Sequence, residues 1–432
     1  MSRSTVLEHR RRFLKTAAGA GSLLAAPLFV PRSVLGATGS PPPSEQIILG
    51  AIGIGGRGSY VLSCFLNEPD CRFAAIADVR VERRTAVKRK ADATYGDSAC
   101  ETYRDFRELL DRQDIDAVLI ATGPNNHGFL SIYSAKAGKD VYCEKPCTKS
   151  ISDSLSLRDT FRRTARLFQA GTQRRSVPHF IFAIELARSG RLGPLTAVHA
   201  HPGGKGGLKG QMSGWFKNPK PEPPKEDLDW HLYLGTAAWR PYPESMPKGS
   251  QFEKGGGLTG GGCLEWGSHC VDLCQWANDA DDTVPVEYFK PAGGEVHARY
   301  ANGCKLVVRG DGWLGLGSCP VRFEGENGWV EVGDSGKIAL SSPALSAGRN
   351  LPDTAGYPAH WHVRNFLDCI KTRRPTAANA DVACHSHIAC HVVNITQFLG
   401  RDLKYDPVKN EFIDDDEANR MRHEAWRAPW HV

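Results

Sequence analysis

An acid, an imidazole and a second acid follow a run of glycines in the stretch GGGCLEWGSHCVD, residues 260–272. Glu265, His269 and Asp272 stand at spacings of four and three, so their side chains share one face if the segment is helical. A histidine oriented by a carboxylate can exchange a proton with a substrate. The stretch therefore predicts a helix that carries an acid–base site, and a solvated helix face is the alternative interpretation.

A glycine-rich loop at residues 53–58 could hold a cofactor for such chemistry. Its G-x-G-x-x-G pattern follows an apolar segment and precedes a predicted helix, the context in which glycines let the backbone approach a pyrophosphate at a helix N-terminus. Asp78 ends the next predicted strand, where a carboxylate accepts hydrogen bonds from ribose hydroxyls and repels a 2′-phosphate. The loop therefore predicts NAD, Arg80 and Arg84 leave NADP open, and a turn needed only for packing is the alternative.

Lys145 could supply a third chemical group. The tripeptide Glu144-Lys145-Pro146 ends a predicted strand of a parallel sheet, which is where such sheets place their ligands. A lysine that faces a cofactor cleft can act as an acid or a base, or hold a developing alkoxide. Taken alone, however, the tripeptide indicates no more than a surface lysine.

The elements that must position these residues divide the chain into two α/β domains. With 432 residues, of which 41% are hydrophobic, the chain is long enough for two cores. Apolar strands alternate with helices over residues 46–168, which predicts a parallel, doubly wound Rossmann domain. Residues 169–432 alternate polar with apolar side chains between glycine turns, which predicts a large, mostly antiparallel sheet. Two further helices are predicted around residues 360–372 and 382–399.

Several motifs together resemble the glucose–fructose oxidoreductase / inositol dehydrogenase family (Gfo/Idh/MocA). They are GxGxxG at 53–58, Asp78, ATGPNNH at 121–127, EKP at 144–146 and the stretch 260–272. The similarity extends over essentially the whole chain after residue 45, and blocks such as GTQRRS at 171–176 resemble an exported, sugar-related subgroup. The resemblance implies a Rossmann domain and a C-terminal α/β domain whose open sheet supports a homodimer or homotetramer. It is specific for the family and not for the substrate.

The resemblance also implies roles for individual residues. Lys145 matches the lysine that contacts substrate and cofactor, and His269 matches the histidine that exchanges a proton with the reacting hydroxyl. Glu265 stands where aspartate is usual, so its carboxylate is one methylene further from the helix. The expected catalytic residues are Lys145, His269, Glu265 and Asp272, the last of which orients or stabilises. The expected cofactor-binding residues are Gly53, Ile54, Gly55, Gly56, Arg57, Gly58, Asp78, Thr122, Asn125, His127, Glu144 and Lys145, with Asn126 beside Asn125 near the nicotinamide. The expected substrate-binding residues are Gln173, Arg174, Trp266 and His269.

The positive charge of the chain is concentrated at its N-terminus. Residues 1–37 contain six basic residues and one acid, so five of the six net positive charges lie there. The nearly neutral remainder argues against a nucleic-acid partner. HRRRFLK, a short apolar run and small residues predict a twin-arginine signal peptide over 1–37, followed by a Pro-rich linker over 38–45. We therefore expect a periplasmic or otherwise exported protein without a membrane span, and the alternatives are an uncleaved anchor or a chance basic tail.

A second cluster of reactive residue types lies near the C-terminus, in CHSHIACH at residues 384–391. Cys384, His387 and His391 would share one helix face at a spacing that could bind zinc. Because the segment lies in a predicted helix beyond the cofactor domain, we expect packed histidines and no metal. The thirteen cysteines show no spaced framework, and most are expected to be small core residues.

An exported nicotinamide enzyme has no obvious pool of free NAD outside the cytosol. We therefore expect a tightly bound cofactor that is regenerated in place. The leading hypothesis is an NAD(P)-dependent oxidoreductase that acts on a hydroxyl of a sugar or glycoside. The first alternative is a glycoside hydrolase that uses transient oxidation and elimination, and the second is a non-catalytic sugar-binding protein with the same fold. A cytosolic dehydrogenase with diffusible NADH would require the signal-peptide prediction to be wrong.

Overall fold

The computed structural model describes residues 42, 45–202, 220–243, 262–290, 293, 295–309 and 315–431. The predicted signal peptide and nearly all of the predicted linker lie outside the described residues, as do Gly260 and Gly261 of the glycine run. Residues 47–432 form the structural unit to which the following description refers. Among the described residues, no helix combines the length and hydrophobicity that a membrane crossing requires.

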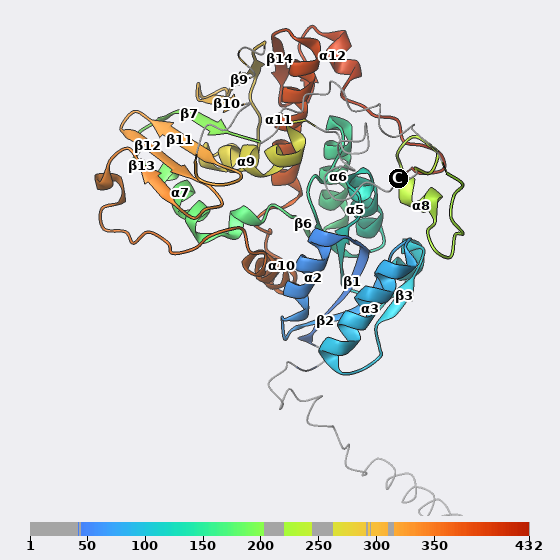
Figure 1. Ribbon diagram of the computed structural model, residues 1–432. Helices are drawn as coiled ribbons and strands as arrows, with labels where there is room; N and C mark the ends of the chain where they lie inside the picture. The colour runs from blue at the N-terminus through green and yellow to red at the C-terminus, as the bar shows by residue number, and fades with distance from the viewer. Residues whose placement is uncertain are drawn as a thin grey trace, which may run out of the picture. The chain divides into compact units, whose positions relative to one another are not determined.

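The first sheet positions the cofactor loop (Figure 1). In the described part of the chain it has six parallel strands in the order β3-β2-β1-β4-β5-β6. They are β1 (Ile47–Ile54), β2 (Cys71–Ala77), β3 (Glu101–Tyr103), β4 (Ala117–Ala121), β5 (Asp140–Cys143) and β6 (Phe168–Ala170). This is the strand order of dinucleotide-binding sheets, which bind ligands outside the carboxyl ends of the strands where the order reverses, here between β1 and β4.

Helices cover both faces of the first sheet, which is why its strands are continuous apolar runs. One face packs against α2 (Gly56–Leu66), α3 (Val81–Tyr95) and α10 (His360–Thr372), and the other against α4 (Phe106–Leu110), α5 (His127–Lys136) and α6 (Ile151–Thr164). Val363 and Phe366 of α10 share a core with Phe65 of α2. A helix from the C-terminal part of the chain therefore completes the core of the first domain, and β6 runs through Ala170, past the boundary expected after residue 168.

Ion pairs hold α10 against the first sheet, and they give a testable prediction. Asp70 accepts hydrogen bonds from both Nη atoms of Arg364, at 2.7 and 2.9 Å, and pairs with Lys371. Burial alone would raise the pKa of Asp70, but the two cations outweigh it and lower the pKa from 3.8 to about 2. Asp70→Asn is expected to lower the free energy of unfolding by about 1 to 2 kcal/mol at pH 7.

The sign of the pH dependence follows from the lowered pKa. The stabilisation by Asp70 is complete above about pH 4 and is lost as the pH falls toward 2. Urea denaturation of the wild type and of Asp70→Asn at pH 7 and pH 3 measures the difference between the two proteins. A difference that is the same at both pH values would contradict the prediction.

The second sheet carries the other half of the fold and confirms the mostly antiparallel prediction. In the described residues it has nine strands, and of the neighbouring strands only β7 and β10 run parallel. In sheet order they are β13 (Ile338–Leu340), β12 (Gly328–Val332), β11 (Val321–Gly325), β7 (Leu195–Ala200), β10 (Lys305–Val308), β9 (Val296–Arg299), β8 (Glu287–Tyr288), β14 (Leu403–Asp406) and β15 (Glu411–Phe412). One face packs against α7 (Pro178–Arg188), α9 (Leu264–Ala277) and α11 (Ala380–Leu399).

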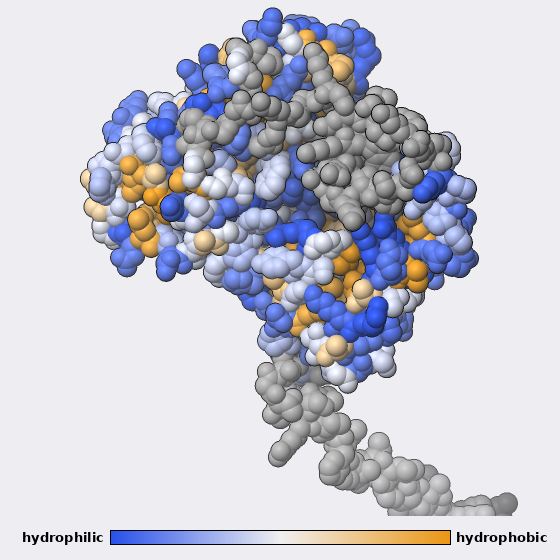
Figure 2. Space-filling model, viewed as in Figure 1, coloured by the Kyte–Doolittle hydropathy of each residue, from blue (hydrophilic) through white to orange (hydrophobic). Residues whose placement is uncertain are grey.

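The opposite face of the second sheet is charged. Arg322 of β11 pairs with Glu324 at 2.8 Å and with Glu331 of β12 at 3.1 Å, and its guanidinium lies 4.1 Å from the ring centroid of Trp329. Arg309 pairs with Glu295 at 2.9 Å beside the same sheet. The side of the molecule drawn in Figure 2 is likewise mostly hydrophilic, with apolar residues in small separate groups. The expectation that this open sheet joins subunits stays a prediction.

Candidate active site

The glycine loop lies between β1 and α2, as its pattern predicts. Gly53 has a φ of +67°, and a Cβ on it would lie 2.3 Å from Cγ2 of Thr122. A Cβ on Gly58 would lie 2.6 Å from Cβ of Ala121, so glycine is needed where α2 packs on β4. Gly55 is the N-cap of α2, and the first turn of that helix holds no acidic residue. The helix N-terminus therefore presents free N–H groups and a favourable field to a phosphate.

Asp78 follows β2 and faces a pocket beside the loop. Its two carboxylate oxygens accept hydrogen bonds from the N–H groups of Ile54, at 3.0 Å, and Arg80, at 2.9 Å. Burial raises the pKa of Asp78, and these hydrogen bonds oppose that shift. The pocket has an empty volume of about 660 Å³, counting space open to solvent. Its polar and loop lining residues include Gly53, Asp78, Arg80, Arg83, Arg104, Thr122 and Gly123. The glycine cradle, the open helix N-terminus and the carboxylate together fit a nicotinamide dinucleotide.

The charge balance of this pocket predicts which dinucleotide is preferred. Asp78→Ser should weaken NAD binding about 10- to 100-fold, because ribose hydroxyls lose a charged acceptor. It should also raise the affinity for NADP relative to NAD, because the pocket keeps its three arginines. Fluorescence titration of each variant with NADH and NADPH measures both effects. Asp116→Ser is the matched control. Asp116 also accepts a hydrogen bond from a β1 N–H, that of Ile48, but at the amino end of the sheet. Unchanged NADH affinity in Asp78→Ser would contradict the prediction.

The loop after β4 is tied to a distant segment of the chain. The side-chain amide of Asn125 donates to the carbonyl of Leu234 at 2.8 Å, and that of Asn126 donates to Tyr233 at 3.2 Å. The ring of His127 lies between the carbonyl oxygens of Pro146, at 2.7 Å from Nδ1, and Thr122, at 3.1 Å from Nε2. Asn125 and Thr122 also line the cofactor pocket, whereas contact of Asn125 and Asn126 with the nicotinamide stays a prediction.

The side chains of Glu144 and Gln173 are joined by a buried hydrogen bond. Nε2 of Gln173 donates to Glu144 at 2.7 Å and to the hydroxyl of Tyr142 at 3.0 Å. Burial raises the pKa of Glu144. Gly171 packs so closely on this carboxylate that a Cβ there would lie 2.8 Å from it. The side chain of Gln173, which the resemblance placed at the sugar, is thus already engaged with Glu144.

Lys145, His269, Arg174 and Trp266 come together from three separate elements. Nζ of Lys145, just after β5, donates to the backbone carbonyl of Glu265 at 2.9 Å and lies 5.2 Å from the ring centroid of Trp266. The same indole lies 6.1 Å from the ring of His269 and 5.8 Å from Cζ of Arg174. Arg174 belongs to the 3₁₀ helix η4 (Gln173–Ser176), and the other two residues to α9. Three of the predicted residues therefore converge on the indole ring of a fourth, Trp266.

His269 is buried, and its electrostatic surroundings keep it neutral. Burial lowers the pKa of His269 well below 6.5, and the positive charges of Arg174, Lys145 and Arg57 lower it further. Its Nδ1 has no hydrogen-bond partner in the described part of the chain. A neutral imidazole with an unused ring nitrogen can accept a proton from a substrate hydroxyl.

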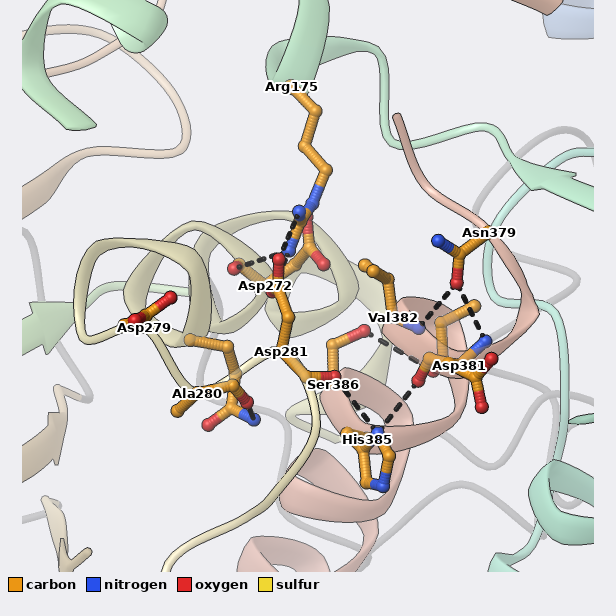
Figure 3. A network of polar contacts seen from close by, with 12 residues as sticks. Arg175, Asp272, Asp279, Ala280, Asp281, Asn379, Asp381, Val382, His385 and Ser386 are labelled. Atoms are coloured by element: carbon orange, nitrogen blue, oxygen red, sulfur yellow. Dashed lines mark hydrogen bonds and ion pairs between the residues drawn. The ribbon is translucent and has the colours of Figure 1, made fainter. Parts of the chain in front are cut away.

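Asp272 bonds to Arg175 and makes no hydrogen bond with His269 in the described residues. Arg175 donates from Nε to Asp272 at 2.7 Å and from Nη1 to Asp281 at 2.9 Å (Figure 3). His385 of α11 bonds the carbonyl of Asp281 at 3.0 Å and extends the network. Burial raises the pKa of Asp272 to about 6, although Arg175 opposes this shift. Asp272 therefore fastens α9 to η4 one turn beyond His269 and positions the helix rather than the imidazole.

The start of α9 explains part of the glycine run. Gly262 has a φ of +59°, and a Cβ there would lie 2.4 Å from the side-chain oxygen of Asn394 of α11. That oxygen accepts the N–H of Cys263 at 2.8 Å. The contact places the first turn of α9 against α11. The side chain of Glu265 is half-buried, and the contact of that residue with Lys145 is through its backbone carbonyl.

Two residues that shape the site lie outside the sequence motifs. Nε of Arg174 donates to Asp334 at 2.8 Å, and its guanidinium carbon lies 4.1 Å from the ring centroid of Tyr357. Arg57 of the glycine loop lies 4.7 Å from the same tyrosine ring. Asp334 follows β12 and Tyr357 precedes α10, and neither lies in a motif, so no sequence signal identified them.

The histidines of α11 are packed in the core. Nε2 of His387 accepts the N–H of Cys147 at 2.9 Å, and its Nδ1 donates to the carbonyl of Ala383 at 2.7 Å. Among the described residues, no group of three histidine, cysteine, aspartate or glutamate side chains could hold a metal ion. All thirteen cysteines are free thiols, and only Cys64 is not fully buried.

The sheet, the glycine loop and the pocket define a dinucleotide-binding fold with a second α/β domain. Residues 47–172 match the family model described as oxidoreductase family, NAD-binding Rossmann fold. Residues 190–432 match the model of the C-terminal alpha/beta domain of the same oxidoreductase family. The chain belongs to the Gfo/Idh/MocA oxidoreductase family, and NAD is its cofactor.

Relatives agree with this assignment over part of the chain. Myo-inositol 2-dehydrogenase of Thermotoga maritima is 30% identical over 145 residues, which are 34% of this chain and 42% of that protein. Glycosyl hydrolase family 109 protein 1 of Bacteroides thetaiotaomicron is 28% identical over 128 residues, 29% of this chain and 27% of that one. The matched region thus spans less than half of either relative. The crystal structure of aldose-aldose oxidoreductase from Caulobacter crescentus shares the fold, with a TM-score of 0.57 at 18% identity over 83% of this chain and 99% of that chain.

Proposed function

We propose that this protein oxidises a hydroxyl group of a sugar or glycoside. The observation that carries the proposal is the meeting of Lys145, His269 and Arg174 around Trp266, in a domain arrangement that binds NAD. When bound, NAD supplies the hydride acceptor. The protein must then accept the hydroxyl proton and stabilise the charge on the oxygen, which are the tasks that an imidazole and an ammonium group perform.

Each residue of the cluster has a distinct task in this proposal. Neutral His269 accepts the hydroxyl proton on a ring nitrogen. Nζ of Lys145, oriented by the carbonyl of Glu265, stabilises the developing alkoxide. Trp266 offers an apolar ring face on which the C–H groups of a sugar can pack. Nη1 of Arg174 is buried without a partner in the described residues, so it can donate a hydrogen bond to the substrate.

The relatives support a polyhydroxylated substrate and also favour a second candidate. One carries the name of an inositol dehydrogenase and another that of a glycosyl hydrolase. The second candidate is therefore net hydrolysis of a glycoside, in which transient oxidation allows the aglycone to be eliminated before water adds. The same residues would serve both reactions, and release of the aglycone distinguishes them.

The proposal includes export, a retained cofactor and an oligomer. The twin-arginine pattern of residues 10–15 supports export, and export favours a cofactor that stays bound through each cycle. The charged face of the second sheet supports association into a homodimer or homotetramer. Cell fractionation tests export, and light scattering of the purified protein tests the oligomeric state.

The experiment for the activity starts from protein purified without added cofactor. The protein is denatured, and the released small molecules are assayed for NAD(H) and NADP(H) by mass. Intact protein is then mixed with inositols, sugars and aryl glycosides while absorbance at 340 nm is followed. One reduction per subunit that stays attached supports the oxidoreductase, and release of free aglycone supports the hydrolase. Protein that turns over only with added NAD would contradict the retained cofactor, and no response to any compound would contradict the activity.

A further inference from the structure

We infer that residues 226–237 form a strap over the adenosine end of the dinucleotide site, and that the cofactor can enter or leave only when this strap moves. The strap includes the short helix α8 (Trp230–Leu234) and comes from the second half of the chain. The inference rests on the NAD assignment and does not depend on which hydroxyl is oxidised. Three sets of contacts hold the strap in place.

The first contacts join the strap to the end of β2. Arg80 and Leu228 form an isolated antiparallel bridge. On either side of it, the N–H of Val81 donates to the carbonyl of Asp227 at 3.0 Å and the N–H of Asp229 donates to that of Val79 at 3.2 Å. The backbone of the strap is thus bonded directly to the residues that follow Asp78, where the ribose would lie.

The second contacts join the strap to the loop after β4. The side-chain amides of Asn125 and Asn126 bond the carbonyls of Leu234 and Tyr233, and the hydroxyl of Thr236 donates to the carbonyl of Asn125 at 2.7 Å. Gly235 is required here, because its φ is +51° and a Cβ on it would lie 1.8 Å from Oδ1 of Asn126. The strap is therefore held on both sides of the glycine loop of β1.

Between these two attachments the strap lines the cofactor pocket. Leu232, Tyr233 and Gly235 form part of the pocket wall together with Asp78 and the loop after β4. The ring of Tyr233 stacks on Trp230, with centroids 5.1 Å apart and an interplanar angle of 16°, so its orientation is set. A segment that bonds to the ends of β2 and β4 spans β1 between them, because β1 separates these strands in the sheet.

The third contacts come from the C-terminal tail, which ends beside α8 (Figure 1). Arg427 donates to three strap carbonyls, those of His231 at 3.0 Å, Gly235 at 2.9 Å and Ala237 at 3.0 Å. Trp430 packs against the aromatic rings of α4 and α5 and also lines the pocket. The tail thus fastens the outer side of the strap.

The strap shares little of the main cores: of its apolar side chains, the half-buried Leu232 packs against the core of the first sheet. Its buried apolar residues form a cluster of their own, separate from the cores of the two sheets: Leu228, Trp230, Leu234 and Ala237. The hydrogen bonds that join the strap to Arg427 are exposed or half-buried, and segments held in this way open at lower free energy than core elements. A cofactor enclosed in this way is released slowly for a structural reason that does not depend on export.

The first test weakens the outer attachment of the strap. Protein is loaded with NADH and mixed with excess NAD in a stopped-flow instrument, and the loss of bound-NADH fluorescence gives the release rate. Arg427→Met should raise this rate at least about tenfold, which corresponds to about 1.4 kcal/mol. Arg401→Met is the matched control, because Arg401 also makes several hydrogen bonds, but to Asp415 and Glu417 beyond α11. Thermal denaturation of both variants verifies that they are folded.

The second test closes the strap covalently. Arg80 and Leu228 face each other as a pair without direct hydrogen bonds, a geometry with Cα atoms about 4.5 Å apart that suits a disulfide. In the double variant Arg80→Cys/Leu228→Cys, oxidation after loading should slow NADH release at least about tenfold. Oxidation before loading should slow binding by a similar factor. The reduced form of the same protein is its own control, so the effect of losing Arg80 cancels.

The outcomes separate the strap from the cofactor assignment. Faster release in Arg427→Met and slower release on oxidation of the double variant support the inference. If the NADH release rate is unchanged in both tests and NADH still binds, the inference about the strap is wrong and the NAD assignment stands. Failure of the wild-type protein to bind any dinucleotide would overturn both.

Discussion

Replacing His269 with asparagine is expected to slow substrate oxidation by about 10²- to 10⁴-fold, the usual contribution of a positioned general base. Asparagine retains a polar side chain that can fill part of the same space but cannot accept the proton. NAD should remain bound, because His269 lies on α9 and not among the residues that line the dinucleotide pocket. The measurement is single-turnover reduction at 340 nm with a substrate identified from the hydroxyl panel.

The control for this variant is His391→Asn. His391 is also buried, burial lowers its pKa to about 3, and its Nε2 has no partner in the described residues, but it lies on α11. This variant should keep the wild-type rate if it folds, which the far-ultraviolet spectrum and the melting temperature establish. Equal losses in the two variants would indicate a general packing effect and contradict the assignment of His269 as the base.

The pH dependence of the wild type tests the same residue without a mutation. Because the pKa of His269 lies well below 6.5, the imidazole remains neutral and able to accept a proton as the pH falls through 6.5. The single-turnover rate should therefore stay near its plateau at pH 6.5 and fall only at more acidic pH. A rate that halves near pH 6.5 would indicate that the base has the pKa of an ordinary exposed histidine, and it would contradict the prediction.

Lys145→Met is the second variant with a large expected effect, a loss of about 10²- to 10³-fold in the rate of oxidation. Methionine keeps much of the apolar stem but lacks the ammonium that stabilises the developing alkoxide. The loss should appear mainly in kcat, because the interaction strengthens as charge develops on the oxygen. Lys145→Arg should restore part of the rate, since it keeps the charge at a different geometry.

Lys139→Met is the matched control for the loss of a lysine. Nζ of Lys139 also donates to backbone carbonyls, those of Arg112 at 2.6 Å and Ile115 at 2.9 Å, but at the amino end of the first sheet. Its loss should affect stability and leave the rate per folded molecule unchanged. A Lys145→Met protein that binds NADH normally and oxidises substrate at the wild-type rate would remove Lys145 from the mechanism.

The local elements follow from the sequence with little error. The apolar segment before the glycine loop is β1, and the helix predicted after that loop is α2. The helix predicted around residues 360–372 is α10. These elements depend on periodicity and on glycine turns, which act over a few neighbouring residues. What periodicity did not reveal is that α10 packs against α2, because this contact joins parts of the chain about 300 residues apart.

The composition of the site was likewise predictable in part. Motif positions predicted that Lys145 and His269 are chemically important, and the structure brings them to one indole ring. The spacing of Asp272 placed it on the helix face of His269 but could not show that Arg175 takes its carboxylate. Helical spacing determines where a side chain starts, whereas its partner depends on what packs opposite.

The sequence by itself determined the two α/β halves, the glycine loop and the positions of the candidate catalytic residues, because each depends on residue types at short, regular spacing. Only the tertiary structure decided the partners of those residues and the enclosure of the cofactor pocket. The strap shows the reason most clearly. Asn125 and Leu234 are brought together by packing of distant segments, and nothing in the local pattern of either segment specifies the other.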